Sequence, residues 1–174
     1  MSETPKRSPW LIVGLVVGGV LLFGVVIVGI LAALGIAGFR GYLSAAKGAE
    51  GRSEAYRLAQ GIARCAENGG PSGTASGAVL PPTAPPVPSN LAQVAGKKYA
   101  SSTSDWSDPA YTCASFSLPM PQYFQYRWEL VSPNNGRAIA RADLDGDGKV
   151  DQEFTAEVTC TSTTCSAVPP PSVR

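Results

Sequence analysis

The stretch "GVVIVGILAALGIAGFRGYLSAAKGAEGRSEAYRLAQ", from Gly24 to Gln60, passes from an uncharged hydrophobic run into a charged, alanine-rich segment without a proline. Proline is excluded from helix interiors because it lacks the backbone N–H and its ring clashes with the preceding turn. The stretch therefore predicts one long helix, apolar on all sides in its first part and amphipathic in its second. We expect such a helix to lie in lipid at one end and to pack on a globular domain at the other.

The apolar run is long. No charged residue occurs from Trp10 to Phe39, whereas a membrane-spanning helix needs about 20 apolar residues and a cleavable signal has a core of only about 7 to 15. We expect residues 10–39 to be the transmembrane half of the helix, after a short cytoplasmic segment, residues 1–9. Lys6 and Arg7 favour a cytoplasmic amino terminus, although more basic residues follow the run: Arg40, Lys47, Arg52 and Arg57.

The amphipathic half of the helix is expected over residues 40–68. Its glycines are points where a bend is credible, since each costs about 1 kcal/mol relative to alanine. Asn68-Gly69-Gly70 is a stop signal, because glycine adopts the left-handed turn that ends helices. Apolar residues recur at three- and four-residue steps, with a charged gap around Glu50, and form one stripe: Leu43, Ala46, Ala55, Leu58, Ile62 and Cys65.

Composition narrows the classes of function. The 174-residue chain has a formal net charge of +1 and no cluster of basic and aromatic residues, which argues against a nucleic-acid partner. It contains no histidine, so Ser-His and Cys-His nucleophiles and histidine-based zinc sites are excluded. No phosphate-binding G-x-x-x-x-G-K-[ST] or nucleophile-elbow G-x-S-x-G motif occurs. We expect a protein that is not an enzyme.

The rest of the chain predicts a loop and a sheet. Residues 69–90 are rich in proline and glycine and are expected to form an extended loop or a tether without fixed structure. Residues 91–174 alternate like half-buried strands over 123–131, 136–145 and 150–160, with turns at 133–136 and 146–148. The fold class is therefore α+β, with the stripe of the long helix covering an antiparallel β-meander head.

The sequence "DLDGDGKVDQEF", from Asp143 to Phe154, is the most specific candidate for a binding site in the chain. Acids at alternate positions before Gly148 match the first half of an EF-hand-type loop, in which carboxylates converge on Ca²⁺. The twelfth place holds Phe154 instead of a bidentate glutamate, and Glu153 stands one residue early. A bound ion would pin the hairpin as a structural cofactor; the alternative is an Asp-Gly turn with solvated acids. The candidate ligands are Asp143, Asp145, Asp147, Asp151 and the main-chain carbonyl of Lys149.

The four cysteines suggest two disulfide bonds. Cys160 and Cys165 enclose "TSTT" and could close a short loop, in which case Cys65 and Cys113 would tie the helix to the head. Four cysteines allow three pairings, and the sequence does not choose among them. Free thiols are the alternative for a cytoplasmic head. Together with the Asp-rich turn, the cysteines favour an oxidising, calcium-bearing compartment outside the cytoplasm.

The stretch from Gly29 to Gln60 resembles the long amino-terminal helix of type IV pilins and pseudopilins. The resemblance implies a non-catalytic subunit of a pilus or pseudopilus, with a single-pass helix in the bacterial inner membrane and a periplasmic head. It also implies that the helix binds lipid and then like subunits or other pilins, in a filament at the cell surface if the chain is processed. A series in the head is similar to pilin-like proteins as well: Trp106–Pro109, Cys113, Tyr123–Tyr126 and Asp143–Gly148.

The chain also departs from the family pattern. Alignment on Gly29–Ala33 places Leu15 where the family has the glycine before the peptidase cut, and Ala37 where it usually has a proline. Val20 stands in place of the glutamate that meets the amino terminus of a neighbouring subunit in that family. Leu15 and Val20 favour a second hypothesis: a permanently anchored, calcium-stabilised periplasmic binding or scaffold module. The sequence does not identify the partner of the head in either case.

Overall fold

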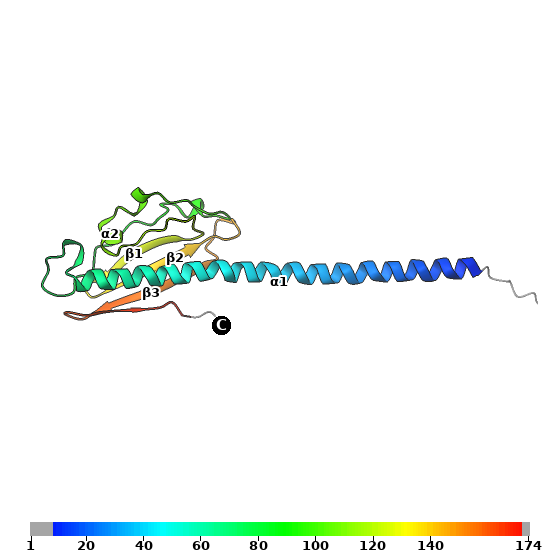
Figure 1. Cartoon of the computed structure of the whole chain (residues 1–174), viewed down its shortest axis with the longest axis horizontal. Helices are drawn as coiled ribbons and strands as arrows, with labels where there is room; N and C mark the ends of the chain where they lie inside the picture. Colours follow the sequence, from blue (N-terminus) through cyan, green and yellow to red (C-terminus); the bar gives the residue numbers. More distant parts are fainter. Residues whose placement is uncertain (1–8, 172–174) are drawn as a thin grey trace, which may run out of the picture. The chain divides into compact units, whose positions relative to one another are not determined.

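The computed structural model describes residues 9–171, and for residues 9, 11, 12 and 35–41 it describes the backbone alone. The fold is α+β, as expected, with a long amino-terminal helix and a four-stranded antiparallel sheet (Figure 1). The chain divides into two compact units between Leu43 and Ser44. The expected cytoplasmic segment lies outside the described residues, apart from Pro9. The elements are α1 (Pro9–Glu67), the 3-10 turns η1 (Gly70–Ser72), η2 (Leu91–Gln93) and η3 (Thr103–Trp106), α2 (Pro109–Cys113), β1 (Gln125–Ser132), β2 (Asn135–Ala142), β3 (Gln152–Cys160) and β4 (Cys165–Val168).

The first unit consists of the apolar part of α1. Among the described residues, one segment is long and apolar enough to cross a membrane: the 22 residues Val13–Leu34. Its side chains are exposed, including Leu22 at 70%. Length and composition would also suit a signal sequence near an amino terminus. The rest of the expected transmembrane run beyond Leu34 lies outside the described side chains.

In the second unit, α1 buries a face that starts later than the predicted stripe. Leu58 and Ile62 are fully buried, as expected, but Leu43 is 40% exposed and Ala46 is also exposed. The expectation for these two residues is wrong, because the first buried residue among those described in the helix is Gly48. The helix ends at Glu67, where the predicted stop signal begins.

Three glycines on this face let the head approach the helix axis. A Cβ added at Gly48 would lie 2.5 Å from Gln152 Oε1, and one at Gly51 would lie 2.5 Å from the Phe124 ring. A Cβ at Gly61 would meet the main-chain oxygen of Ala114 at 2.4 Å. The charged gap in the predicted stripe therefore contains two of these close approaches, at Gly48 and Gly51. Glycine costs helix propensity there, but only glycine leaves the space.

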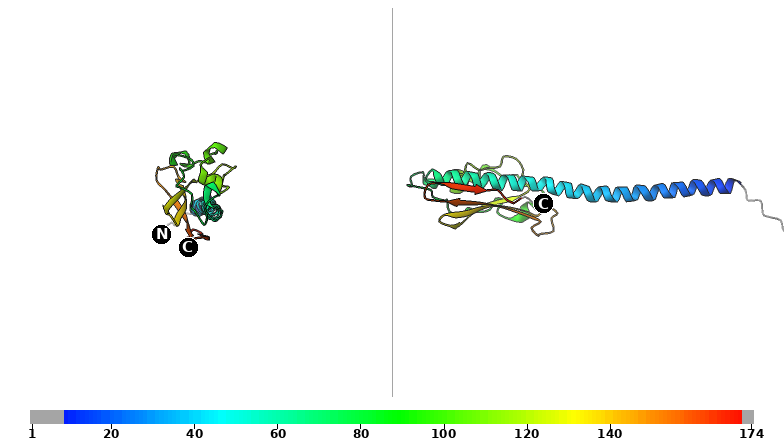
Figure 2. Two further views of the ribbon diagram at one scale, coloured as in Figure 1. Left: turned by 90° about the vertical axis from the view of Figure 1, so that its left-hand side faces the viewer. Right: turned by 90° about the horizontal axis from the view of Figure 1, so that it is seen from below.

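The sheet is a simple meander with the strand order β1-β2-β3-β4 (Figure 2). Register pairs such as Tyr126↔Ala140 and Ala140↔Phe154 place large rings beside alanines on the inner face. Trp128, Tyr126 and Phe124 are fully buried there. The small residues of β2 leave room for these rings under α1, and this is the core of the head.

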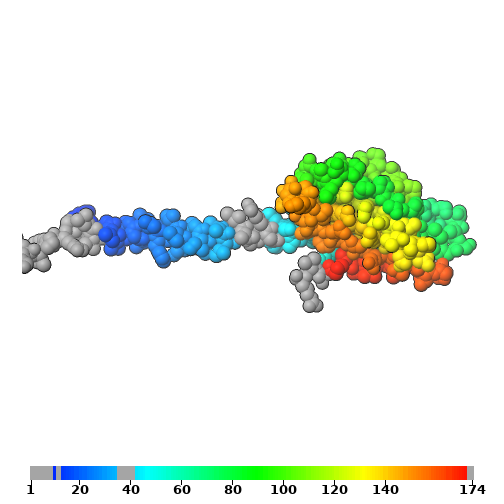
Figure 3. Space-filling view, turned by 180° about the vertical axis from the view of Figure 1, so that it is seen from behind, coloured from blue at the N-terminus to red at the C-terminus, as the bar shows by residue number. Residues whose placement is uncertain are grey.

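The outer face of the sheet, on the side seen in Figure 3, carries charged side chains that pair with one another. One carboxylate oxygen of Glu129 accepts hydrogen bonds from Arg127 and Arg137, each at 3.0 Å, and the Arg137 contact lowers the pKa of that carboxyl. Arg141 lies 2.7 Å from its cross-strand partner Glu153. With Glu157, which lies opposite Arg137, the three arginines are balanced by three glutamates, so these side chains offer no net charge to attract a charged partner.

The proline-rich segment is ordered and covers the outer edge of β1. Val87 and Tyr126 exchange two main-chain hydrogen bonds of 2.8 Å, and Ala84 N donates to Trp128 O at 3.1 Å. The Trp128 Nε1–H donates to Pro81 O at 3.0 Å. The extended path was predictable, but the segment is not a free tether. It occupies the strand edge that would otherwise remain open to other chains.

Two disulfides connect these parts. Cys65–Cys113 joins the last turn of α1 to the end of α2, with 5.4 Å between the Cα atoms. Cys160–Cys165 joins opposite residues of β3 and β4, with a Cα–Cα distance of 4.0 Å. These pairs are one of the three combinations that the sequence allowed. The strand β4 was not predicted, because its four residues show no hydrophobic alternation of their own.

Candidate metal centre

The acidic loop connects β2 to β3. The last register pair of the two strands is Ala142↔Gln152, and Asp151 N donates to Ala142 O at 2.8 Å, which closes the loop at its base. Gly146 and Gly148 have positive φ values of 82° and 87°. Glycine is suited to both positions, because a side chain is strained in that conformation. The two glycines let the chain fold back over its own acids.

Asp143 is the buried acid of this loop, with 1% of its surface exposed. Its Oδ1 accepts a hydrogen bond from Gly146 N at 2.7 Å, and its Oδ2 accepts one from Gly148 N at 2.9 Å. Its main-chain oxygen accepts from Gly96 N at 2.9 Å, which ties the loop to the segment after η2. The carboxylate is thus held in place by the backbone.

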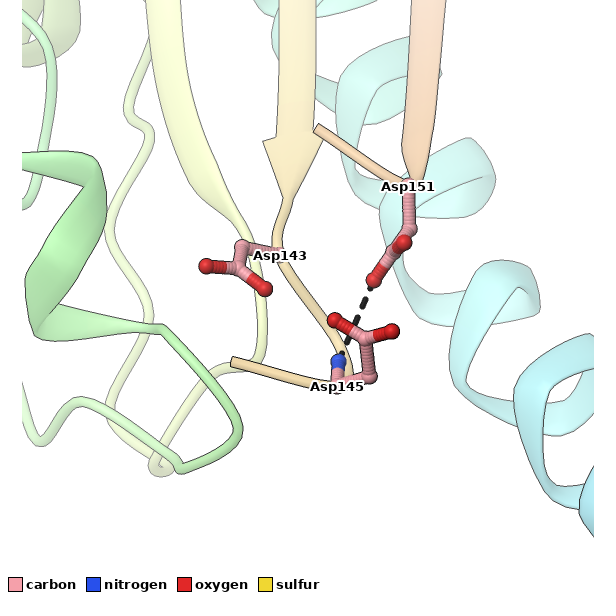
Figure 4. Close-up of side chains that lie close together, drawn as sticks. All are labelled: Asp143, Asp145 and Asp151. Carbon is pink, nitrogen blue, oxygen red and sulfur yellow. Dashed lines mark hydrogen bonds between the residues drawn. The ribbon is translucent and has the colours of Figure 1, made fainter. Parts of the chain in front are cut away.

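Asp145 and Asp151 lie on the exposed side of the same loop (Figure 4). The Oδ2 atom of Asp151 accepts hydrogen bonds from the N–H groups of Leu144 and Asp145, the latter at 3.1 Å. Carboxylate oxygens of Asp143, Asp145 and Asp151 all lie within 4.8 Å of one another. This group could hold a metal ion, and it includes two of the three acids from the alternate positions of the motif.

The fourth predicted carboxylate lies elsewhere, and so do the two residues at the end of the motif, which were not predicted as ligands. Asp147 is outside the group: its Oδ1 accepts from Lys149 N at 2.8 Å, and its Oδ2 is 3.8 Å from Lys149 Nζ. Glu153 is paired with Arg141 on the outer sheet face, and the Phe154 ring lies in the core. The second half of the motif therefore belongs to strand β3 rather than to an EF-hand helix. Reasoning from sequence missed the role of Gly96, which no local pattern indicates.

The chemistry of the group suits a hard cation. Ca²⁺ and Mg²⁺ take oxygen ligands, and three nearby carboxylates repel one another unless a cation or hydrogen bonds compensate them. Six to eight ligands are usual for Ca²⁺, so main-chain carbonyls or water would complete the shell. Such an ion would join the base of the β2–β3 hairpin to its tip.

Comparisons with known proteins add no relative. No family model, no curated protein and no solved structure matches the chain. The support for a function therefore comes from the residues and contacts of the chain itself.

Proposed function

We propose that the chain is a type IV pilin-like structural subunit, held in a bacterial inner membrane by the first part of α1, with a periplasmic head. The observation that supports this most is the double use of one continuous helix. Val13–Leu34 exposes apolar side chains, and from Gly48 the same helix supplies the buried face of the head. An exposed apolar segment of that length needs lipid or other apolar helices around it.

The head supports a structural role in assembly or surface presentation rather than catalysis. One disulfide links β3 to β4 of its antiparallel meander and another links α1 to α2, and both suit an oxidising compartment. Its outer face is self-neutralised, and the sequence carries no histidine for nucleophilic chemistry. The partners of the apolar helix would be membrane lipid and then like subunits or other pilins.

The second candidate is a permanent membrane anchor that carries a calcium-stabilised binding or scaffold module. Val20 favours it, since this residue is apolar where the family has the glutamate that pairs with a neighbouring amino terminus. Leu15 favours it too, because the family has glycine before the peptidase cut.

The intact mass of the protein from its native membrane, purified without reducing agent, distinguishes the two. For a filament subunit we expect a loss that matches removal of the residues before Leu15 or Val16. A full-length mass supports the permanent anchor, and loss of the whole segment through Leu34 would contradict both proposals. In each case the two disulfides predict a deficit of four hydrogens.

The acidic loop, we further propose, binds calcium in a structural role. We expect calorimetric titration at millimolar Ca²⁺ to show binding, and the melting temperature of the head to rise with Ca²⁺ and fall with a chelator. Binding to the folded state alone stabilises by about 2.7 kcal/mol at a ligand concentration of 100 Kd. If millimolar Ca²⁺ produces neither a heat of binding nor a shift in melting temperature, the proposal is wrong.

Two matched variants test which acids hold the ion. Asp145→Asn removes a carboxylate of the group and should weaken Ca²⁺ binding by a large factor. Asp147→Asn makes the same change two residues along, outside the group, and should have a much smaller effect. Equal effects from both variants would mean that the loop attracts cations only by its overall charge.

A further inference from the structure

Three segments meet at the end of the head where α1 enters it. They are residues 44–52 of α1, residues 95–98 and the acidic loop, residues 143–151. The Gln152 Nε2 atom, just after the acidic loop, donates a hydrogen bond to Ser44 Oγ at 3.0 Å. Gly96 N donates to the main-chain oxygen of Asp143 at 2.9 Å. These contacts join the three segments into one surface, which we call the loop end of the head.

Four basic side chains at the loop end have no ion-pair partner among the described residues. No carboxylate oxygen there lies within 4.0 Å of their charged nitrogens. They are Lys47, Arg52, Lys97 and Lys98. The arginines of the outer sheet face differ, because each of them is bonded to a glutamate. In the same described part of the chain, Arg64 in the last turn of α1 is the one other unpaired basic side chain. The unpaired positive charge of the head is therefore concentrated at the loop end.

Two of these lysines share one aromatic ring. The Nζ atoms of Lys47 and Lys98 each lie 4.7 Å from the centroid of the Tyr123 ring. Such a contact positions an ammonium group without neutralising its charge. Glu50 lies on the same helix, but it is half-buried and its Oε1 accepts a hydrogen bond from Tyr123 N at 2.8 Å. Lys97 and Lys98 are exposed, so their ammonium groups are accessible to an anion outside the chain.

The chain also limits how far the loop end can lie from lipid, provided that the apolar part of α1 spans a membrane as proposed above. Ser44 comes ten residues after Leu34, the last residue of the apolar segment. Ten helical residues extend about 15 Å, whereas the head-group layer on each side of a bilayer is about 5 to 7 Å thick. The remaining distance is about one screening length at physiological salt. Anionic head groups are therefore the charged partner within reach of these lysines.

The acids of the loop lie at the same end and weaken a long-range attraction. The three segments together contain five basic and five acidic residues, so the loop end has no net charge. Asp143 is buried, and Asp147 lies 3.8 Å from Lys149. A divalent cation in the acidic loop would leave two net positive charges. Attraction to an anionic surface is therefore a contact effect, and it is strongest when the loop holds the proposed Ca²⁺.

We propose that Lys47, Lys97 and Lys98 dock the loop end of the head on the phosphate groups of anionic lipids. The inference rests on the membrane anchorage proposed above and adds a second contact with the same bilayer. Because α1 keeps the head close to the lipid, weak contacts are enough for docking. Each lysine near an anionic surface strengthens the attraction about fivefold.

The test uses the full chain in nanodiscs of zwitterionic lipid, with or without added anionic lipid, at millimolar Ca²⁺. Acetylation of each lysine amine is followed by mass spectrometry. Anionic lipid should slow the acetylation of Lys47, Lys97 and Lys98 by at least about fivefold. Lys149, which is already beside Asp147, should be slowed much less. Salt at about 1 M shortens the screening length to about 3 Å and should abolish the difference between the lipids.

Two variants show which charges are responsible. The double change Lys97→Gln and Lys98→Gln should remove most of the protection of Lys47. Arg64→Gln removes one exposed charge at the other end of the amphipathic part of α1 and should leave that protection unchanged. Millimolar inorganic phosphate added to zwitterionic nanodiscs should give no protection.

Equal acetylation in the two lipids overturns the proposal, and so does equal slowing of Lys149. Loss of protection in Arg64→Gln would also overturn it, as would protection by inorganic phosphate, which would indicate a site for a soluble anion. A chain that does not enter zwitterionic nanodiscs contradicts the membrane anchorage and this inference with it. A chain that enters them but shows no effect of anionic lipid contradicts this inference alone.

Discussion

Replacing Trp128 by alanine is expected to lower the free energy of unfolding of the head by about 3 to 5 kcal/mol. The ring is fully buried on the inner face of the sheet, where it packs against Gly136, so closely that an added Cβ there would lie 2.3 Å from the ring. Its Nε1–H also satisfies Pro81 O. Alanine would leave a cavity and a buried carbonyl without a donor, and it would remove the side-chain hydrogen bond between β1 and the edge segment at Pro81.

Urea unfolding of the full chain in detergent measures this effect. Trp128→Phe keeps most of the ring contact and removes the hydrogen bond, so it should cost less, about 1 to 3 kcal/mol. Met120→Ala, at a side chain that is 73% exposed, is the control and should change stability by no more than about 0.5 kcal/mol. A loss below 1 kcal/mol for Trp128→Ala would show that the proline-rich segment and the ring do not form part of the core.

Removing the Cys65–Cys113 disulfide by a double change to alanine should have the second large effect. The bond closes a loop with a sequence separation of 48 residues. The chain-entropy relation gives about 4 kcal/mol for such a loop at 25 °C, within the usual range of about 2 to 5 kcal/mol. The bond also joins the end of α1 to α2, so hydrogen exchange should rise in both elements when it is absent.

The second disulfide is the matched control for this prediction. Cys160–Cys165 has a sequence separation of 5, for which the same relation gives about 2 kcal/mol. We therefore expect its double alanine variant to lose about half as much stability, measured by urea unfolding under the same conditions. A larger loss from the short loop would mean that holding β4 in place, rather than loop entropy, dominates the contribution of these bonds.

Local patterns in the sequence determined the long helix, its stop at Asn68-Gly69, the three longer strands and the acidic turn. Each of these follows from the side-chain period or from the backbone freedom of glycine, which act within a few residues. The candidate metal site was found for the same reason, since its acids are close neighbours in the chain. Its membership was only partly predicted: Asp143, Asp145 and Asp151 come together, but Asp147 turns away to Lys149.

Only the tertiary structure decided where the helix is buried, what the proline-rich segment covers and how the cysteines pair. The charged gap near Glu50 looked like an interruption of the stripe, yet Gly48 and Gly51 lie there in close contact with Gln152 and Phe124. The short strand β4 exists because β3 pairs with it, and the extended residues 81–87 are fixed in place because β1 offers its edge. These features depend on partners far away in the sequence, and close packing between such partners leaves no periodic trace in either segment alone.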